Sequence, residues 1–300
     1  RKITDMKDSI SVYYFDTDNI QNFGDVINPL IVSKISFRPV VKESIKKAQL
    51  LAIGSILQCL VKENPRLKDR IKKNFQKKIH VWGTGLISPL ETGAFLRRAM
   101  SIHALRGKYT RAELARHTKQ DLSGIPLGDP GLLASRLLTT LPEKRFKVGI
   151  IPHYVDQYDP AVQTLKSLHP SSTVIPVLGD PVETLNKIAQ CEIVLSSAMH
   201  GLIAADSLNI PNQWIQFSDK LTGGTFKFND YYSVFDIVPI AWNVRNKTIT
   251  VENILSIPDQ YRITPDQVKQ VQDVLVEAFP FRSQAPSCAT QPKMLSNQPH

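Results

Sequence analysis

The feature that most constrains this chain is a repeated alternation of short apolar runs with longer stretches of helical periodicity. Several of the apolar runs are unbroken rather than alternating with polar residues, as expected for parallel strands that helices cover on both faces. Helical patterns lie between them, for example over 182–190, 201–208 and 265–279. Strand-then-helix alternation is typical of doubly wound sheets, so the pattern predicts an α/β fold. The expected strands are 11–15, 49–54, 79–82, 101–105, 146–151, 173–177, 193–195, 213–217 and 238–241.

Two features divide the chain near residues 139–145. The segment TTLPEKR contains a proline and mixed charges, and the strand-like run FKVGII follows it. Residues 1–150 carry 27 Lys and Arg against 13 Asp and Glu, a net charge of +14, whereas residues 151–300 carry 10 against 14, a net charge of −4. We therefore predict two Rossmann-like domains, over 1–143 and 144–281, with a C-terminal helix that packs back toward the first domain. Residues 282–300, rich in Ser, Gln and Pro, are expected to form a disordered tail.

Composition excludes several classes of protein. The chain has 300 residues, of which 42% are hydrophobic and 21% charged, a globular composition. Its three cysteines include no CxxC pair, which argues against a disulfide scaffold and a zinc ribbon. No apolar run approaches the roughly 18 residues of a membrane helix, and no apolar signal core opens the chain. We expect a soluble, cytoplasmic protein.

The positive charge is concentrated between Lys62 and Lys78, where eight Lys and Arg accompany two acids. Such a stretch suits nucleic acid, an anionic membrane surface or an anionic substrate, and it also suits a solvated helix face. Phe75 is its single aromatic residue, so the stacking platform of a nucleic-acid site is missing. We therefore expect no nucleic-acid partner.

Polar residues follow three of the predicted strands. Asn22, Gly24 and Asp25 follow the first strand and open a helix, where ligands bind in open α/β sheets. Arg106 ends the run SIHALRG, and an arginine at such an edge commonly recognises an anion. His153 ends the first strand of the second half. A capping turn for the first group and a packed loop histidine for His153 are the alternatives.

The strongest local signal is the run IVLSSAMHGLIAADSL at residues 193–208. An apolar strand leads into two serines, and a helix begins at His200 and Gly201, with Ser197 or a neighbour as its cap. A helix N-terminus offers free N–H groups and partial positive charge to an anion. His200 at that place can bind a phosphate or carboxylate and can move a proton, and Gly201 lets a ligand approach the backbone. The alternative is a capping histidine.

Three further motifs are less specific. Gly83 and Gly85 lack the third glycine and the acid about 20 residues on that a dinucleotide site needs, so they predict a tight turn that still permits ligand approach. The triplet at 16–18, DTD, occurs in some metal-dependent glycosyltransferases but stands here before any nucleotide-binding unit, which favours a polar loop. LGDP occurs at 127–130 and at 178–181, and in each copy we expect the aspartate to cap and the proline to take the first helical position.

Taken in order, the motifs resemble the polysaccharide pyruvyl transferases, over roughly residues 10–280. The set comprises NFGD at 22–25, the pair Gly83 and Gly85, LRG at 105–107, LGDP at 127–130, GIIPHY at 149–154, SSAMHG at 196–201 and KFNDYY at 227–232. The resemblance implies a GT-B-like fold, in which two Rossmann-like domains face a cleft. It also implies transfer of the pyruvyl group of phosphoenolpyruvate to the hydroxyls of an exopolysaccharide or capsule sugar, as a ketal.

The resemblance implies roles for individual residues. Asp25, Arg106 and His200 are expected to be catalytic, and the donor is expected to contact Arg106, Met199, His200, Gly201 and Lys227. The acceptor side or the cleft is expected to include Asn22, Gly24, Gly83, Gly85, His153 and Asp230. Ala198 stands where the family often has a larger polar residue, which leaves the donor contacts there open. The expected chemistry requires neither a metal nor a cofactor.

The resemblance also implies partners. The sugar acceptor is expected to be carried on a polyprenyl diphosphate, with the first domain held at the anionic inner face of the membrane by residues 62–78. A GT-B glycosyltransferase that uses a sugar nucleotide shares the fold, the cleft and the anion site, and it is the alternative function.

Overall fold

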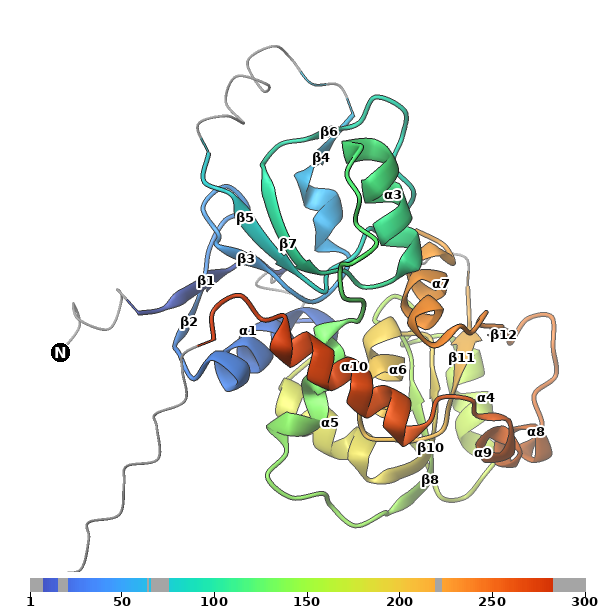
Figure 1. Cartoon of the computed structure of the whole chain (residues 1–300). Coiled ribbons are helices and arrows are strands. Elements are labelled where there is room, and N and C mark those ends of the chain that lie inside the picture. The colour runs from blue at the N-terminus through green and yellow to red at the C-terminus, as the bar shows by residue number, and fades with distance from the viewer. Residues whose placement is uncertain (1–7, 16–20, 64, 66–75, 219–222, 283–300) are drawn as a thin grey trace, which may run out of the picture.

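The computed structural model describes residues 8–15, 21–63, 65, 76–218 and 223–282. The predicted tail after residue 282, the triplet at 16–18 and most of the basic stretch therefore lie outside the described residues. Figure 1 shows two sheets, one formed by the first part of the chain and the other by the second, with helices around and between them. Within the described part of the chain, no helix is both long enough and apolar enough to cross a bilayer.

The first sheet is parallel and has the strand order β2-β1-β3-β5-β7. A short antiparallel pair, β4 with β6, lies beside it. The strands and helices of this part are β1 (Ile10–Val12), α1 (Phe23–Ser36), β2 (Val40–Lys42), β3 (Leu50–Leu51), η1 (Ile56–Leu60), β4 (Val61–Lys62), β5 (Ile79–Trp82), β6 (Phe95–Leu96), β7 (Met100–Ala104), α3 (Lys108–Thr118) and η2 (Pro130–Leu137).

The second sheet is also parallel, with the order β12-β11-β10-β8-β9. Its elements are β8 (Phe146–Ile151), α4 (Pro160–Ser167), β9 (Ser172–Val174), α5 (Pro181–Ala189), β10 (Cys191–Ser196), α6 (Met199–Ser207), β11 (Asn212–Gln216), α7 (Phe226–Tyr232), η3 (Ser233–Phe235), β12 (Trp242–Asn243), α8 (Val251–Leu255), α9 (Ile257–Gln260) and α10 (Pro265–Glu277). The chain is thus a mixed α/β protein built on parallel sheets.

Both sheets share one feature of order. The first strand of each, β1 or β8, lies between the second and third strands of its sheet, so the direction of winding reverses beside it. Ligands of open α/β sheets bind at such a reversal, outside the carboxyl ends of the strands. The topology therefore marks one place in each sheet where a site is expected.

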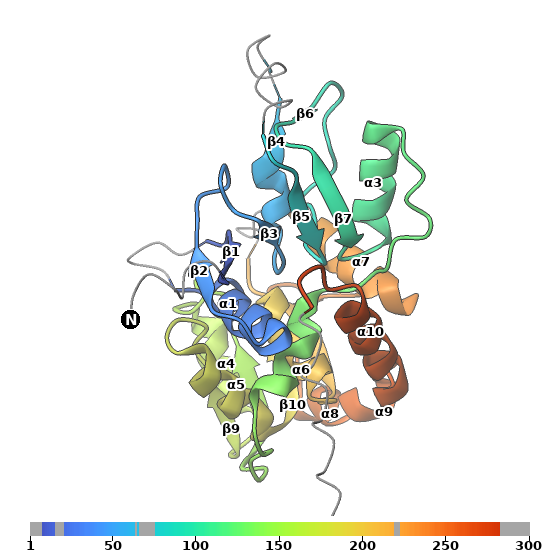
Figure 2. The same cartoon turned by 60° about the vertical axis from the view of Figure 1, so that its left-hand side comes forward.

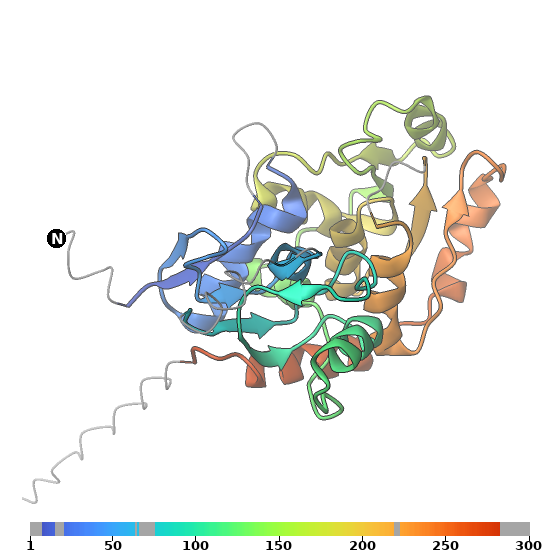
Figure 3. The same ribbon diagram turned by 90° about the horizontal axis from the view of Figure 1, so that it is seen from above.

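The apolar core lies in layers around the two sheets. One cluster joins β1, α1, η2, β8, α5 and α10, so the helices between the sheets share a core with both of them. The outer face of the first sheet packs on η1 and α3, and the outer face of the second packs on α4, α8 and α9. Figure 2 shows α1 between the strands of the first sheet and the elements of the second half of the chain. Figure 3 shows α10 and α4 on opposite sides of the molecule.

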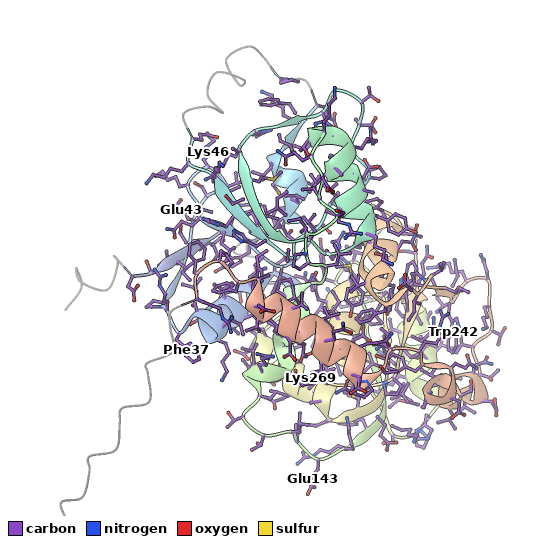
Figure 4. All side chains as sticks on the ribbon, in the orientation of Figure 1. Phe37, Glu43, Lys46, Glu143, Trp242 and Lys269 are labelled. Carbon is purple, nitrogen blue, oxygen red and sulfur yellow. The ribbon has the colours of Figure 1, made fainter. Side chains whose placement is uncertain are left out.

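The end of α10 contacts the first sheet. Trp82 of β5 donates its Nε1–H to the carbonyl of Leu275 at 2.8 Å, and its ring meets that of Phe279 edge to face. The strands of the two sheets divide on either side of residue 143, but η2, which precedes that residue, packs on α6 of the second half. In Figure 4, Glu143 lies on an outer loop before β8, and Phe37 at the end of α1 also points outward. The domain boundary stays a prediction.

Most expected strands have counterparts, and one expectation is wrong. Strands 79–82 and 146–151 match β5 and β8 residue for residue, and the two LGDP segments do begin η2 and α5 with a capping aspartate. Residues 238–241 are not a strand; β12 begins at Trp242. Pro239 has no N–H for a ladder, and Val238 and Ile240 are both more than 70% exposed, so this apolar run is neither paired nor buried.

Candidate functional site

A cleft of about 450 Å³ opens at the carboxyl ends of strands from both sheets. Residues 22–25 and 54–55 line it after β1 and β3, and residues 153–155 and 198–201 line it after β8 and β10. These are the two places where the winding of each sheet reverses. Eight of the predicted site residues line this cleft: Asn22, Gly24, Asp25, His153, Met199, His200, Gly201 and Lys227.

Asp25 is the carboxylate of the cleft. It lies in the first turn of α1, and its Oδ2 accepts a hydrogen bond from Asn22 Nδ2 at 2.9 Å. Burial raises the pKa of Asp25, while the hydrogen bond from Asn22 and the nearby His200 and Lys227 act against that rise. A carboxylate whose pKa is raised toward neutrality is a stronger proton acceptor, so Asp25 is suited to act as a general base.

His200 is positioned by a close contact with the backbone of α1. It is the second residue of α6, and a Cβ on Gly24 would come within 2.1 Å of its Nδ1. The backbone of α1 therefore lies directly against the imidazole, and only a glycine leaves room for the ring. The first turns of α1 and α6 meet at this point, so the ring lies between two helix N-termini.

The N-terminus of α6 differs from the expectation in one respect. Ser197 does not cap it; Ser197 Oγ accepts the backbone N–H of His153 at 2.8 Å, which ties the end of β8 to the end of β10. The N-cap residue is Ala198, and no side chain among the described residues caps the helix. An uncapped N-terminus that borders a cleft is suited to an anionic ligand.

Lys227 brings an ammonium group to the cleft from α7. The pKa of Lys227 is lowered to about 8, chiefly by burial and also by the nearby Arg106, while Asp25 acts in the opposite direction. Burial and Lys227 together lower the pKa of His153 to about 4. At neutral pH, Lys227 is thus mostly charged, whereas His153 is a neutral imidazole.

Arg106 and Asp230 lie in the wall behind the cleft. Both side chains are fully buried, and Arg106 Nε donates to Asp230 Oδ2 at 2.8 Å. Arg106 Nη1 donates to Ser55 Oγ at 2.8 Å and Nη2 donates to the carbonyl of Leu86. The sequence placed this arginine among the donor contacts; in the structure its guanidinium serves partners within the protein, and Ser55 is the partner that reaches the cleft.

Gly83 and Gly85 also lie outside the cleft, and their small size has packing reasons. A Cβ on Gly83 would come within 2.3 Å of Pro130, at the start of η2, and Gly83 has a φ of 81°. A Cβ on Gly85 would come within 2.4 Å of the Arg106 guanidinium. The small size of these two glycines therefore makes room for η2 and for the Arg106 side chain.

Sequence reasoning missed Gly54 and Ser55. They follow β3, one of the four strands whose carboxyl ends reach the cleft. The reasoning that identified Asn22 and His153, a position just after a strand, applies to them as well. Asp129 was identified only as a cap. The sequence carried no signal that it is fully buried or that it lies 3.8 Å from His200.

Comparisons with known proteins agree with the resemblance in the motifs. Residues 30–218 match the model of the family described as polysaccharide pyruvyl transferase. An uncharacterised protein of Acanthamoeba polyphaga mimivirus is 32% identical over 76% of this chain and 75% of its own length. The succinoglycan biosynthesis protein ExoV of Rhizobium meliloti is 25% identical over 73% of this chain and 63% of its own length.

Solved structures are more distant. A protein of uncharacterised function from Klebsiella pneumoniae aligns with a TM-score of 0.39 and 12% identity, over 74% of this chain and 88% of its own.

Proposed function

This chain belongs to the polysaccharide pyruvyl transferase family, and on that premise we propose that it transfers the pyruvyl group of phosphoenolpyruvate to a sugar of an exopolysaccharide or capsule repeat unit. The product is a pyruvate ketal, and phosphate is released. We further propose a GT-B-like arrangement, in which the two parallel sheets belong to two Rossmann-like domains and the cleft between their strand ends is the active site.

The observation that carries the proposal is the set of groups gathered in one cleft. A carboxylate, an imidazole and an ammonium (Asp25, His200 and Lys227) line it together with the uncapped N-terminus of α6. Phosphoenolpyruvate carries a carboxylate and a phosphate, so Lys227 and the helix N-terminus suit its two charges. Asp25 and His200 supply the proton acceptor and the proton donor that the reaction needs.

The proposed reaction balances its protons between these residues. Protonated His200 transfers its proton to the methylene carbon of phosphoenolpyruvate. The N–H bond breaks, the electron pair of the double bond forms the new C–H bond, and the methylene becomes the methyl group. The first sugar hydroxyl attacks the neighbouring carbon, and Asp25 takes its proton, which returns to His200. The second hydroxyl then closes the ketal at the same carbon as the phosphate leaves, and its proton departs with the phosphate. Each positioned acid or base typically contributes about 10²–10⁴-fold to the rate.

Arg106 lies in the wall behind the cleft and does not line it. Its bond to Ser55 fixes a cleft residue, and its bond to Asp230 holds α7, the helix that carries Lys227. We propose that Arg106 acts on the donor through these two partners. The acceptor is proposed to be a sugar on a polyprenyl diphosphate, which residues 62–78 would meet at an anionic membrane surface.

A donor screen tests the function. The protein is incubated with a panel of candidate oligosaccharides and either phosphoenolpyruvate or sugar nucleotides, and phosphate and nucleotide release are measured. We expect phosphate release from phosphoenolpyruvate that depends on an oligosaccharide, and none from the His200→Ala variant. Nucleotide release that depends on an acceptor would instead assign the chain to the glycosyltransferases.

A further inference from the structure

The edge of the His200 ring that faces away from Gly24 contains an unsatisfied nitrogen. His200 Nε2 is buried and has no hydrogen-bond partner among the described residues, and the same holds for Asp129 Oδ2. These two atoms are 3.8 Å apart. Buried polar groups are nearly always paired, so two unpaired ones that face each other require an explanation.

Asp129 is held firmly in this place. It is fully buried, and its Oδ1 accepts the backbone N–H of Gly131 at 2.8 Å as the N-cap of η2. Gly128 before it has a φ of 152°, and a Cβ there would come within 2.6 Å of Val271 on α10. One carboxylate oxygen is therefore used by the cap, while the other is left beside the imidazole.

The second LGDP segment provides an internal comparison. Asp180 is also an N-cap, its Oδ1 accepts the N–H of Glu183 at 2.8 Å, and a proline follows it. Asp180 is exposed, however, and it lies in a different part of the fold, at the start of α5. An aspartate can therefore cap a helix in this motif without being buried and without using its second oxygen. The burial of Asp129 and the position of its Oδ2 beside His200 need another explanation.

We propose that Asp129 is a positioning residue for His200. When the cleft is occupied, its Oδ2 accepts a hydrogen bond from His200 Nε2–H. The carboxylate thereby fixes the tautomer whose Nδ1 faces Gly24 and the cleft, and it balances the charge of the imidazolium. The gap of 3.8 Å has to shorten, as catalytic hydrogen bonds commonly do when a substrate binds. The inference rests on the proposed function in so far as His200 moves a proton.

The Asp129→Asn variant tests the proposal, because it keeps the shape and the capping oxygen and changes only the second oxygen into an NH₂ donor. The matched control is Asp180→Asn, which makes the same change in the other LGDP segment. Nitrogen NMR of histidine-labelled protein reports the tautomer of His200, whose signal is assigned by its loss in His200→Gln. The tautomer is measured with and without phosphoenolpyruvate, and kcat and the KM for the donor are measured beside it.

We expect neutral His200 to carry its proton on Nε2 in the wild type and in Asp180→Asn, and on Nδ1 in Asp129→Asn. We expect kcat of Asp129→Asn to fall about 100-fold or more, as happens when the wrong tautomer of a catalytic histidine is trapped, and its donor KM to change less than about threefold. Asp129→Ser, which keeps a capping oxygen, should lose the tautomer preference and serves if the asparagine variant does not fold.

An unchanged tautomer in Asp129→Asn and Asp129→Ser would overturn the proposal and leave Asp129 as a cap alone. So would a kcat for Asp129→Asn equal to that of Asp180→Asn. If no variant, including the wild type, consumes phosphoenolpyruvate, the proposed function fails, but the tautomer comparison still decides whether Asp129 positions His200.

Discussion

At the scale of single residues, the charge of Lys227 predicts how kcat/KM for phosphoenolpyruvate depends on pH. Because its pKa is lowered to about 8, the ammonium is mostly present at pH 7 and is lost as the pH rises through 8. If the ammonium binds the donor, kcat/KM for phosphoenolpyruvate should fall on the alkaline side with a midpoint near 8. The measurement is a pH profile of kcat/KM between pH 6 and 10.

The Lys227→Arg variant separates this residue from others that titrate in the same range. A guanidinium stays charged throughout, so the alkaline fall should move upward by about one pH unit or more, even if the absolute rate drops. An alkaline limb at the same pH in both proteins would mean that Lys227 does not hold the donor.

The sequence located part of this site because strand ends are visible in it. Asp25, His153 and His200 each follow an apolar run, so their positions at one edge could be predicted. Arg106 also follows a strand, but the direction of its side chain depends on Asp230, which lies 124 residues away. The burial of Asp129 beside His200 is likewise a product of tertiary packing.

At the scale of elements, the contact between α1 and α6 predicts the effect of one methyl group. Gly24→Ala places a Cβ 2.1 Å from His200 Nδ1, so the imidazole must move. The helix α1 itself is not weakened, because alanine has a higher helix propensity than glycine. We expect the melting temperature to change by only a few degrees and kcat to fall by about 100-fold, the cost of a displacement of roughly 1 Å at a reacting group. Thermal melts and steady-state kinetics measure the two effects.

Gly124→Ala is the control for that experiment. No atom lies within 4 Å of a Cβ at this glycine, so the added methyl should leave kcat unchanged. If Gly24→Ala turns over as fast as Gly124→Ala, the position of His200 is not limiting for the reaction.

The position of α7 provides a second test at this scale. Arg106→Lys keeps the charge but cannot serve Asp230, Ser55 and the carbonyl of Leu86 together. Hydrogen bonds to charged groups contribute about 1.5–3 kcal/mol each, so the free energy of unfolding should fall by about 2 kcal/mol or more. Chemical denaturation measures it. The control is Arg111→Lys, which changes a half-buried arginine of α3 whose guanidinium donates only to the carbonyl of Ser123 among the contacts described, and it is expected to change the free energy of unfolding little.

The donor KM of Arg106→Lys decides between positioning and direct contact. We expect it to rise together with the loss of stability, because Ser55 and α7 both lose a partner. A large rise in the donor KM with an unchanged free energy of unfolding would show that Arg106 itself grips the donor.

Strands could be predicted where they are buried, because a buried strand appears in the sequence as an unbroken apolar run. Strands 79–82 and 146–151 are central and apolar, and their bounds were predicted correctly. The edge strand β2 and the pair β4 and β6 were missed because each has only two or three residues and, unlike the equally short β3, is not fully buried. No apolar run therefore marks them in the sequence.

At the scale of the whole molecule, the alternation of strands and helices was sufficient to predict an α/β protein with parallel sheets. It could not predict how the two sheets share a core, because the contacts of η2 and α10 join residues far apart in the sequence.

The uneven distribution of charge along the chain predicts that residues 62–78 bind an anionic membrane. Residues 62–78 carry eight basic residues against two acids, and each basic residue near an anionic surface contributes about 1 kcal/mol. We expect co-sedimentation with anionic vesicles that falls steeply between low and moderate salt. Changing Lys68, Lys72, Lys73 and Lys77 to Gln should abolish it.

The matched control changes the lysines at 166, 187, 247 and 269, in the second half of the chain, to Gln and should bind as the wild type does. Binding that does not depend on salt, or that both sets of changes reduce equally, would contradict a role for residues 62–78.

We propose that the pyruvyl group of phosphoenolpyruvate becomes a ketal on a sugar, and this step can be observed directly. The most direct measurement is mass spectrometry and carbon NMR of a candidate oligosaccharide after reaction with phosphoenolpyruvate labelled at the central carbon. We predict a gain of about 70 Da, as the acid–base scheme requires, a labelled carbon bonded to two sugar oxygens, and equimolar phosphate, all absent with His200→Ala. Release of phosphate without a labelled ketal on any acceptor, or an equal yield from His200→Ala, would contradict the account.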